Sequence, residues 1–178
     1  MQFIASDALA RARRVRLVIF DVDGVLTDGK LWYGPGGEEL KAFHAFDGHG
    51  VKLLELGGLK TALISGRESQ AVAERARELG IEHVIQGAHD KQAAFRGLLR
   101  RMGLKQQASA YMGDDLVDMA VLRRCGFACA PHEAPEEVRR CAHYVASAPA
   151  GHGAAREVCE FILEAQGKLG RVLARYRR

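Results

Sequence analysis

Short apolar runs alternate with longer amphipathic stretches along the chain, and this alternation predicts a parallel sheet wrapped by helices. The predicted strands are residues 15–20, 61–65, 83–86, 108–112 and 127–130. The predicted helices are residues 50–56, 68–79, 91–102, 115–123, 134–140 and a last one from 154 past 163. In the second helix Val72, Ala76 and Leu79 recur at helical spacing, and Gly80 follows as a stop signal. We therefore expect an α/β fold with a doubly wound, Rossmann-like and mostly parallel sheet that has helices on both faces.

One segment, residues 29–46, departs from this alternation. Its sequence GKLWYGPGGEELKAFHAF places two β-prone runs on either side of the turn-forming GPGG, which predicts a β-hairpin. Because the segment follows directly on the first strand and its acids, we expect the hairpin to lie over the site as a flap. No repeat or low-complexity linker divides the chain, so we expect one domain over residues 1–178, with a C-terminal tail at about 147–178.

Composition narrows the classes of function. The 178 residues are 48% apolar and 27% charged, which suits one domain with a full hydrophobic core. No stretch approaches the roughly 20 apolar residues that span a bilayer. The first residues, MQFIASDALARARRVR, lack the apolar core and cleavage site of a secretory signal. The cysteines, Cys125, Cys129, Cys141 and Cys159, have no CxxC spacing, and we expect reduced thiols of a cytoplasmic protein.

The net charge of +4 does not indicate a nucleic-acid partner. Basic residues concentrate at the two ends, in RARRVR and GRVLARYRR, and between them acids and bases alternate on the predicted helices. Tyr176 is the one aromatic residue interleaved with the basic ones at these ends, whereas a single-strand binder would need several. We expect neither a nucleic acid nor a membrane as partner.

Polar side chains follow the predicted strands at the points where the strands end. Asp21 and Asp23 follow the first strand, Ser65 ends the second and precedes Gly66 and Arg67, Lys91 opens the helix after the third, and Asp114, Asp115 and Asp118 follow the fourth. Ligands bind beyond the carboxyl ends of the strands in open parallel sheets, so we expect these groups to share one rim. Several carboxylates, one hydroxyl and two cations are the set that phosphoryl transfer requires.

We expect each of these groups to have a separate role in the reaction. Asp21 and Asp114 would supply carboxylate ligands to Mg²⁺, with the Asp23 backbone carbonyl as a third ligand. Asp21 would attack phosphorus to form an aspartyl-phosphate, and Asp23 would protonate the leaving oxygen and later deprotonate water. Ser65 and Lys91 would hold the remaining phosphate oxygens. Each motif alone also has a structural explanation, such as an acid that caps a helix; their joint occurrence at strand ends favours catalysis.

The order DVDGVLTDG, ISGR, Lys91 and GDDLVD resembles the haloacid dehalogenase-type phosphatase superfamily. Over residues 15–163, the segments DGVLTDG, GPGGEELKAFHAFDGHGVKLL, ISGRES, RARELGI, QGAHDK and GHGAAREVCEFIL are similar to one branch, the 3-deoxy-D-manno-octulosonate 8-phosphate phosphatases. The resemblance implies a magnesium-dependent enzyme of lipopolysaccharide biosynthesis that has no cap domain. It also implies a homotetramer in which a neighbouring subunit's hairpin closes the site. It gives Asp21, Asp23, Ser65, Lys91 and Asp114 the roles stated above, and it places Asp115 and Asp118 behind them.

The resemblance further implies which residues contact a sugar-acid phosphate, some of them across a subunit boundary. These are Asp23, His44, Ala45, Phe46, Asp47, Gly48, Lys52, Arg67, Arg75 and Lys91. An acidic sugar phosphate needs cations beyond the phosphate site, and arginine can bind a carboxylate through two parallel hydrogen bonds. Without the resemblance, Arg75 would be interpreted as a solvated residue on a helix face.

The glycine-rich stretch AGHGAARE, residues 150–157, is a feature of the same branch. The resemblance implies a mobile segment that reaches toward a neighbouring active site. Ala150, His152 and Ala155 stand where the branch usually has a glycine pair and often a basic residue. We expect this departure to affect the contacts of the tail rather than catalysis.

Three other functions stay open. Related nine-carbon sugar-acid 9-phosphate phosphatases share most of these motifs, but some place Glu where Arg67 stands, which favours the eight-carbon substrate here. A phospho-aspartate receiver domain also combines Asp residues, a hydroxyl and a Lys on a doubly wound sheet, but Asp23 and the GDDLVD cluster favour hydrolysis. A non-catalytic oligomerising domain would not need the full set of catalytic side chains that this chain has.

Overall fold

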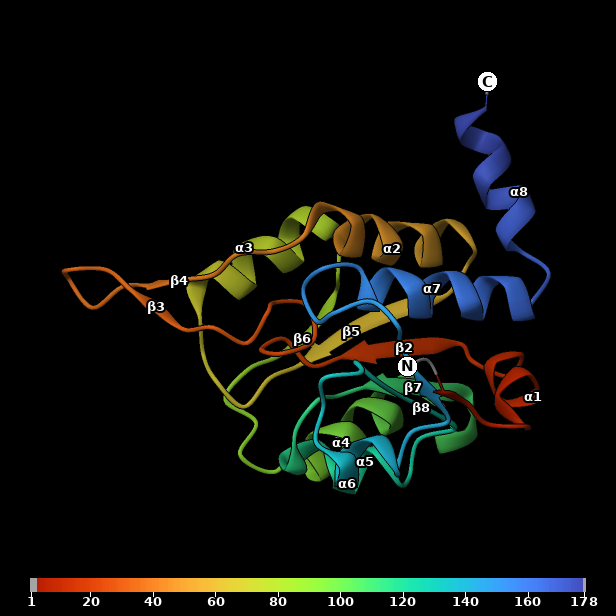
Figure 1. Cartoon of the computed structure of the whole chain (residues 1–178), viewed down its shortest axis with the longest axis horizontal. Coiled ribbons are helices and arrows are strands. Elements are labelled where there is room, and N and C mark those ends of the chain that lie inside the picture. Colours follow the sequence, from red (N-terminus) through yellow and green to blue (C-terminus); the bar gives the residue numbers. More distant parts are fainter. Residues whose placement is uncertain (1–2, 178) are drawn as a thin grey trace.

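A seven-stranded sheet forms the centre of the protein in the computed structural model, which describes residues 3–177 (Figure 1). Its strands, in spatial order, are β1 (Phe3–Ile4), β9 (Tyr144–Val145), β8 (Phe127–Ala130), β7 (Ser109–Met112), β2 (Leu17–Phe20), β5 (Lys60–Ile64) and β6 (His83–Ile85). All neighbouring strands pair in parallel except β1, which pairs with β9 in the antiparallel sense. The predicted doubly wound, mostly parallel sheet is thus confirmed.

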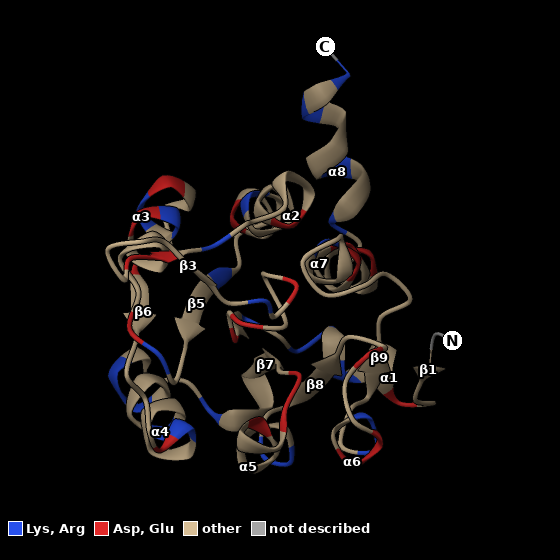
Figure 2. Ribbon diagram, turned by 60° about the vertical axis from the view of Figure 1, so that its left-hand side comes forward, with Lys and Arg blue, Asp and Glu red and all other residues tan. Residues whose placement is uncertain are grey.

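Helices cover both faces of the sheet (Figures 1 and 2). One layer contains α2 (Ala45–Leu56), α3 (Gln70–Leu79) and α7 (Ala154–Ala165), and the other contains α4 (Lys91–Met102), α5 (Met119–Leu122) and α6 (Glu136–Arg139). Helix α1 (Ala8–Ala12) lies at one end of the sheet, and α8 (Leu169–Leu173) projects from the body toward the C-terminus. Single 3₁₀ turns occupy Gln106–Ala108, Leu116–Asp118 and Ala174–Tyr176.

Strand β2 divides the hydrophobic core into two layers. Successive side chains of a strand point to opposite faces of the sheet. Val18 and Phe20 therefore pack into the layer under α2, α3 and α7, while Leu17 and Ile19 pack into the layer under α4, α5 and α6. All four side chains are fully buried, and the strand is consequently a continuous apolar run, as is typical of a parallel strand covered on both faces. This rigid strand leads directly into Asp21.

The predicted strands agree with the structure to within two residues at either end, and the helix at 91–102 has the bounds of α4. Helix α2 begins five residues earlier than predicted, because the glycines of its first turns disfavour a helix when read alone. Their small size is needed there: a Cβ at Gly50 would lie 2.9 Å from the Arg156 Cα on α7. Strands β1 and β9 and helices α1 and α8 were not predicted, since each is five residues or shorter.

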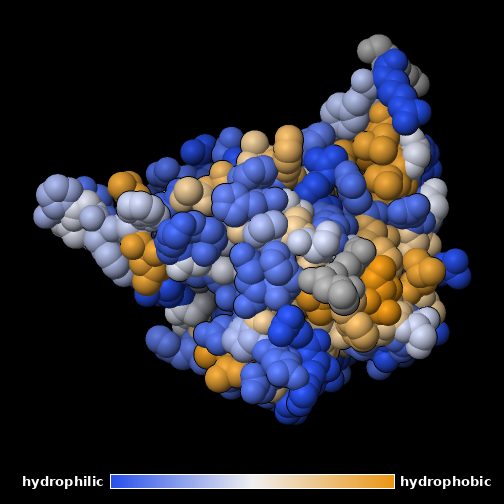
Figure 3. All heavy atoms as spheres, viewed as in Figure 1, coloured by the Kyte–Doolittle hydropathy of each residue, from blue (hydrophilic) through white to orange (hydrophobic). Residues whose placement is uncertain are grey.

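The predicted hairpin is present and projects from the body beside α3 (Figure 1). It consists of β3 (Trp32–Tyr33) and β4 (Glu39–Leu40), paired in the antiparallel sense. Leu31, Trp32, Tyr33 and Leu40 are exposed by 43–60%, and the hairpin accordingly shows hydrophobic side chains on its surface (Figure 3). Within residues 3–177 no cap domain accompanies it. The helices of this part of the chain also lack the length and hydropathy that a membrane crossing requires.

Candidate active site

The candidate active site lies at the carboxyl ends of β2, β5 and β7. In the parallel register, Phe20 at the end of β2 is opposite Leu63 on one side and Met112 on the other. Asp21 follows β2, and its backbone N–H donates to the Met112 carbonyl over 2.9 Å, so it extends the strand by one residue. A cavity of about 300 Å³ opens here, lined by Asp21, Asp23, Gly29, Leu31, Ser65, Gly66, Arg67, Lys91, Asp114, Asp115 and Val117.

Lys91, the first residue of α4, connects two carboxylates. Its Nζ lies 2.8 Å from Asp21 Oδ2 and 2.7 Å from Asp118 Oδ1, and the three residues are 6%, 6% and 0% exposed for Lys91, Asp21 and Asp118. Burial alone would lower the pKa of Lys91, but the charges of the two carboxylates outweigh it, and the pKa is raised. Lys91 is therefore a fixed cation at the floor of the cavity.

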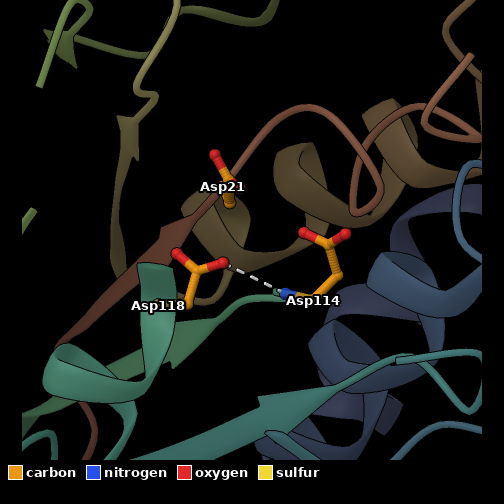
Figure 4. A group of neighbouring side chains, drawn as sticks. All are labelled: Asp21, Asp114 and Asp118. Atoms are coloured by element: carbon orange, nitrogen blue, oxygen red, sulfur yellow. Dashed lines mark hydrogen bonds between the residues drawn. The ribbon is translucent and has the colours of Figure 1, made fainter. Parts of the chain in front are cut away.

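Asp118 organises the loop after β7. Its Oδ1 accepts a hydrogen bond from the Tyr111 hydroxyl over 2.6 Å, and its Oδ2 accepts from the backbone N–H groups of Asp114 and Asp115 at 3.2 and 3.3 Å. These bonds turn residues 116–118 into a 3₁₀ turn instead of the first turn of the predicted helix. Asp118 thus fixes the backbone of Asp114, through the hydrogen bond drawn as a dashed line in Figure 4.

The surroundings of Asp21 and Asp114 disfavour the ionised form of both carboxyl groups. Burial, followed by the nearby charge of Asp118, raises the pKa of Asp21 to about 7, although Lys91 acts in the opposite direction. Burial and the charge of Asp21 likewise raise the pKa of Asp114 to about 7. A bound cation would favour the ionised form of both carboxylates, of which Asp21 is buried and Asp114 half-buried.

The residues present fit a divalent cation. Oxygens of Asp21, Asp114 and Asp118 lie within 4.8 Å of one another, and Figure 4 shows Asp118 below Asp21, with Asp114 to the right of both. Asp114 Oδ1 is buried without a hydrogen-bond partner. Gly24 has a left-handed φ of 81°, and a Cβ there would lie 2.1 Å from Asp114 Oδ2, so glycine is required for this approach. Carboxylate oxygens are the ligands that Mg²⁺ prefers.

Two further predicted catalytic residues lie at the wall of the cavity. Ser65 follows β5, is 2% exposed, and its Oγ accepts a hydrogen bond from the Arg67 backbone N–H over 3.2 Å. Asp23 lies two residues beyond Asp21, and its carboxylate forms an ion pair with Lys41 from the hairpin. The structure therefore brings the predicted carboxylates, the hydroxyl and the lysine together in one cavity.

The predicted substrate-binding residues lie in different parts of the structure. Asp23, Arg67 and Lys91 line the cavity. Residues 44–48 form the N-terminus of α2, where His44 is the N-cap residue and accepts from the Phe46 backbone N–H over 3.2 Å. Ala45 and Phe46 are exposed there, whereas Gly48 is buried.

Asp47 points away from the cavity and into the α2–α7 contact. Its Oδ2 accepts from the Gly153 backbone N–H at 3.1 Å, and its Oδ1 accepts from the Arg156 backbone N–H at 2.9 Å. The carboxylate is 1% exposed and caps α7, whose own N-cap residue is a glycine. Within one subunit the Asp47 side chain therefore serves the fold.

Lys52 and Arg75 also lie outside the cavity. Lys52 Nζ is 3.7 Å from Glu55 Oε2 and would be 3.2 Å from a Cβ at Gly80, at the far end of α3. Arg75 donates to Glu78 Oε2 over 2.8 Å and lies over the Phe43 ring, 5.8 Å from its centroid. If either residue contacts substrate, the contact is not made in the cavity of its own subunit.

The stretch 150–157, expected to be mobile, packs against its own chain. The Gly151 backbone N–H donates to the Val25 carbonyl at 3.1 Å, and a Cβ at Gly151 would lie 2.4 Å from the Thr27 carbonyl carbon. The His152 ring is exposed and lies 5.8 Å from the His44 ring. It borders a second hollow that also reaches Asp114. The segment thus supports the loop that follows Asp21.

Three residues of the site were not predicted: Glu39, Lys41 and Tyr111. Glu39 and Lys41 are two residues apart at the end of the hairpin, so they lie on the same side of it, and this spacing was the available signal. Tyr111 stands in a buried strand, where its hydroxyl needs a partner and finds one in Asp118.

The chain is similar to known phosphatases along nearly its whole length. A family model of haloacid dehalogenase-like hydrolases matches residues 81–158. The 3-deoxy-D-manno-octulosonate 8-phosphate phosphatase of Escherichia coli K12 is 42% identical over 166 residues, which cover 93% of this chain and 88% of that protein. The Yersinia pestis enzyme of the same name is 43% identical over 93% of this chain and 89% of its own.

A solved structure of the Moraxella catarrhalis enzyme, in complex with magnesium, phosphate and a KDO molecule, superposes with a TM-score of 0.94. It is 40% identical, and the match covers 96% of this chain and 98% of that one. Fold, site geometry and sequence agree, and the chain belongs to the haloacid dehalogenase-like hydrolases, within them to the family of 3-deoxy-D-manno-octulosonate 8-phosphate phosphatases.

Proposed function

We propose that the protein is a magnesium-dependent phosphatase that converts 3-deoxy-D-manno-octulosonate 8-phosphate into the free sugar acid and phosphate, a reaction of lipopolysaccharide biosynthesis. The observation that supports this most strongly is the meeting of Asp21, Lys91 and Asp114 in one cavity of a chain 42% identical to enzymes named for this reaction. The alternatives of a receiver domain and a non-catalytic domain are not favoured by this family membership.

In the first step Asp21 Oδ1, the oxygen not bound to Lys91, attacks phosphorus. A bond forms between this oxygen and phosphorus, while the bond from phosphorus to the sugar oxygen breaks. Asp23 gives its proton to that sugar oxygen, which leaves as an alcohol. Lys91 and Ser65 bind the phosphate oxygens as their charge changes, and Lys91 also keeps the Asp21 carboxylate in place.

In the second step a water molecule attacks the phosphorus of the aspartyl-phosphate. Asp23, now without its proton, takes one from the water. The bond between phosphorus and Asp21 breaks, which releases phosphate and restores the carboxylate. Mg²⁺, held by Asp21, Asp114 and the Asp23 backbone carbonyl, would offset the repulsion between the nucleophile and the anionic phosphate.

Arg67 is the cation best placed to recognise the sugar acid. It lines the cavity beyond Lys91, and its side chain is 43% exposed, so an entering ligand can reach it. Its guanidinium donates to the Tyr33 hydroxyl at 2.8 Å and to Glu39 Oε2 at 3.4 Å, and both partners belong to the hairpin. A substrate carboxylate that replaced Glu39, which makes a single contact, would bind the guanidinium through two parallel hydrogen bonds.

A homotetramer in which a neighbour's hairpin covers this cavity would explain the exposed apolar side chains. Trp32 and Tyr33 are 57% and 60% exposed on the hairpin, and Leu116 and Val117 are 58% and 62% exposed beside the cavity. Such clusters are typical of interaction surfaces. Light scattering after size exclusion should give four subunits. Trp32→Ala should reduce that number, while Leu9→Ala, which removes another exposed apolar side chain far from the hairpin, should not.

The proposed reaction takes place in the cytoplasm. The reduced thiols that the spacing of the four cysteines predicts would suit this reducing compartment.

A panel of sugar phosphates tests the proposed substrate. With magnesium present, the octulosonate 8-phosphate should give the highest kcat/KM, ahead of the nine-carbon acid 9-phosphate and of neutral hexose phosphates. Removal of magnesium by a chelator should abolish turnover, and its return should restore it. Equal or faster turnover of the nine-carbon substrate would reject the assignment of the sugar while leaving the phosphatase chemistry intact.

A further inference from the structure

Lys41 is a lysine with a buried side chain and has no role in the mechanism proposed above. It follows β4 at the base of the hairpin, and its side chain is only 1% exposed. Its ammonium forms ion pairs with Asp23 Oδ1 and Glu39 Oε1. Lysine is almost never fully buried unless it is paired, and here both partners are carboxylates.

The charge of this group is secured by its partners. Burial alone would lower the pKa of Lys41, but the hydrogen bonds and charges of Asp23 and Glu39 prevail and raise it. The lysine is therefore an ammonium with three donors, and it faces the one residue that has to give and take a proton in the proposed mechanism.

From this geometry we infer that Lys41 is a positioning residue for Asp23, which fixes one carboxylate oxygen so that the other faces the leaving group. Lys41 binds Oδ1, and Oδ2 is the oxygen without that contact. Asp23 stands in a loop at the wall of an open cavity, with its side chain 21% exposed, so it would otherwise sample several rotamers. Misplacement of a reacting group by about 1 Å can cost roughly 100-fold in rate.

The same contacts make the acid/base residue dependent on the hairpin. Glu39 connects Lys41 to Arg67, whose Nη2 is 3.4 Å from Glu39 Oε2. Arg67 in turn binds the Tyr33 hydroxyl at 2.8 Å. The orientation of Asp23 is thus tied to the hairpin and to Arg67 through three consecutive ion pairs, Asp23–Lys41, Lys41–Glu39 and Glu39–Arg67.

The inference rests on the role proposed for Asp23, and the leaving group provides its test. An alkyl phosphate such as a sugar phosphate needs its leaving oxygen protonated, whereas p-nitrophenyl phosphate expels a stable anion without an acid. Lys41→Met keeps an unbranched side chain that is shorter by one atom and removes the ammonium. We expect kcat/KM for the sugar phosphate to fall by about 100-fold, within the range for general acid catalysis, and that for p-nitrophenyl phosphate to fall less than about fivefold.

Three comparisons make the result specific. Asp23→Asn should show the same dependence on the leaving group, and adding Lys41→Met to it should cost little more, because residues that act as a unit are not additive. Lys41→Arg, which keeps a cation, should recover part of the loss. Lys30→Met is the matched control: Lys30 is on the same connection but pairs with Asp28 and is 68% exposed, so this change should leave both substrates unaffected.

Two outcomes would overturn the assignment. Equal losses for both substrates in folded Lys41→Met would indicate a merely structural lysine, and unchanged rates would show that Asp23 needs no such support. The proposed substrate is tested separately, since any alkyl phosphate that the wild-type protein hydrolyses can serve in the comparison. If the wild-type protein hydrolyses no alkyl phosphate with magnesium, both the proposed function and the role of Lys41 are rejected.

Discussion

Lys91 and Asp21 form a buried ion pair with 2.8 Å between Nζ and Oδ2, and Lys91 is shared with a second carboxylate on its other side. One cation therefore serves two anions, and a third, Asp114, lies close by. The pocket has more negative charge than its own side chains neutralise. This imbalance suits the binding of a cation.

Removal of the shared cation should damage both stability and activity. Lys91→Met leaves Asp21 and Asp118 buried without their partner, and breaking a buried pair in this way costs about 3–5 kcal/mol of unfolding free energy. Urea unfolding at about pH 8 without magnesium measures the loss. In the Lys91→Met background, Asp21→Asn should restore part of it, because it removes one unpaired charge; strictly additive effects of the two changes would contradict this coupling.

Asp21→Asn alone should abolish turnover and yet stabilise the metal-free protein at alkaline pH. The folded-state pKa of Asp21 is raised from 3.8 to about 7, so the folded state binds this proton more tightly than the unfolded state. The unfolding free energy of the wild-type protein should therefore fall as the pH rises from about 4 to about 7. Asparagine cannot ionise, and the variant should show a smaller fall over that window. Identical pH profiles of the two proteins would contradict the prediction.

Magnesium binding should weaken as the pH falls below neutrality. With pKa values of about 7, Asp21 and Asp114 hold protons that the metal must displace. Calorimetry at about pH 5.5 and about pH 8 should give a lower affinity and greater proton release at the lower value. Asp114→Asn should bind magnesium more weakly and with a smaller dependence on pH. An affinity that does not change between the two pH values would rule out these carboxylates as the ligands.

Asp47→Ala should affect stability rather than substrate binding within a subunit. It removes the acceptor for the backbone N–H groups of Gly153 and Arg156, and loss of a helix cap typically costs about 0.5–2 kcal/mol. Asp47→Asn keeps one acceptor oxygen and should lose less. KM for the sugar phosphate should stay within about twofold in both variants, as expected of a residue that makes no ground-state contact. A large rise in KM at unchanged stability would instead support the substrate contact that the family resemblance implies.

Most of the fold and the centre of the site could be predicted from the sequence, for a physical reason. A parallel sheet buries its strands on both faces, so runs such as 15–20 stand out, and the residues that follow them must meet at one edge. This placed Asp21, Ser65, Lys91 and Asp114 in one cavity.

The parts that could not be predicted depend on contacts between distant segments. Nothing near Asp47 in the sequence indicates a helix whose N-cap residue, Gly153, lies 106 residues later, so this cap was not predicted. The role of Lys41 also depends on a distant segment, because this side chain is buried only when the hairpin folds back onto the loop of Asp23. Short elements such as β9 are likewise formed by their neighbours, since two residues alone have no detectable pattern.

The Asp47 cap also bears on the order in which the chain folds. A ribosome releases α2 more than 100 residues before the amides of Gly153 and Arg156 that its carboxylate needs. Until α7 is synthesised, the nascent sheet has one helical layer incomplete, and the Asp47 carboxylate lacks the two amides that donate to it. The segment from Gly153 onward therefore closes the fold, and contacts of such sequence separation slow folding. A nascent chain stalled before residue 153 should remain open to proteases even though all of its catalytic side chains have already been made.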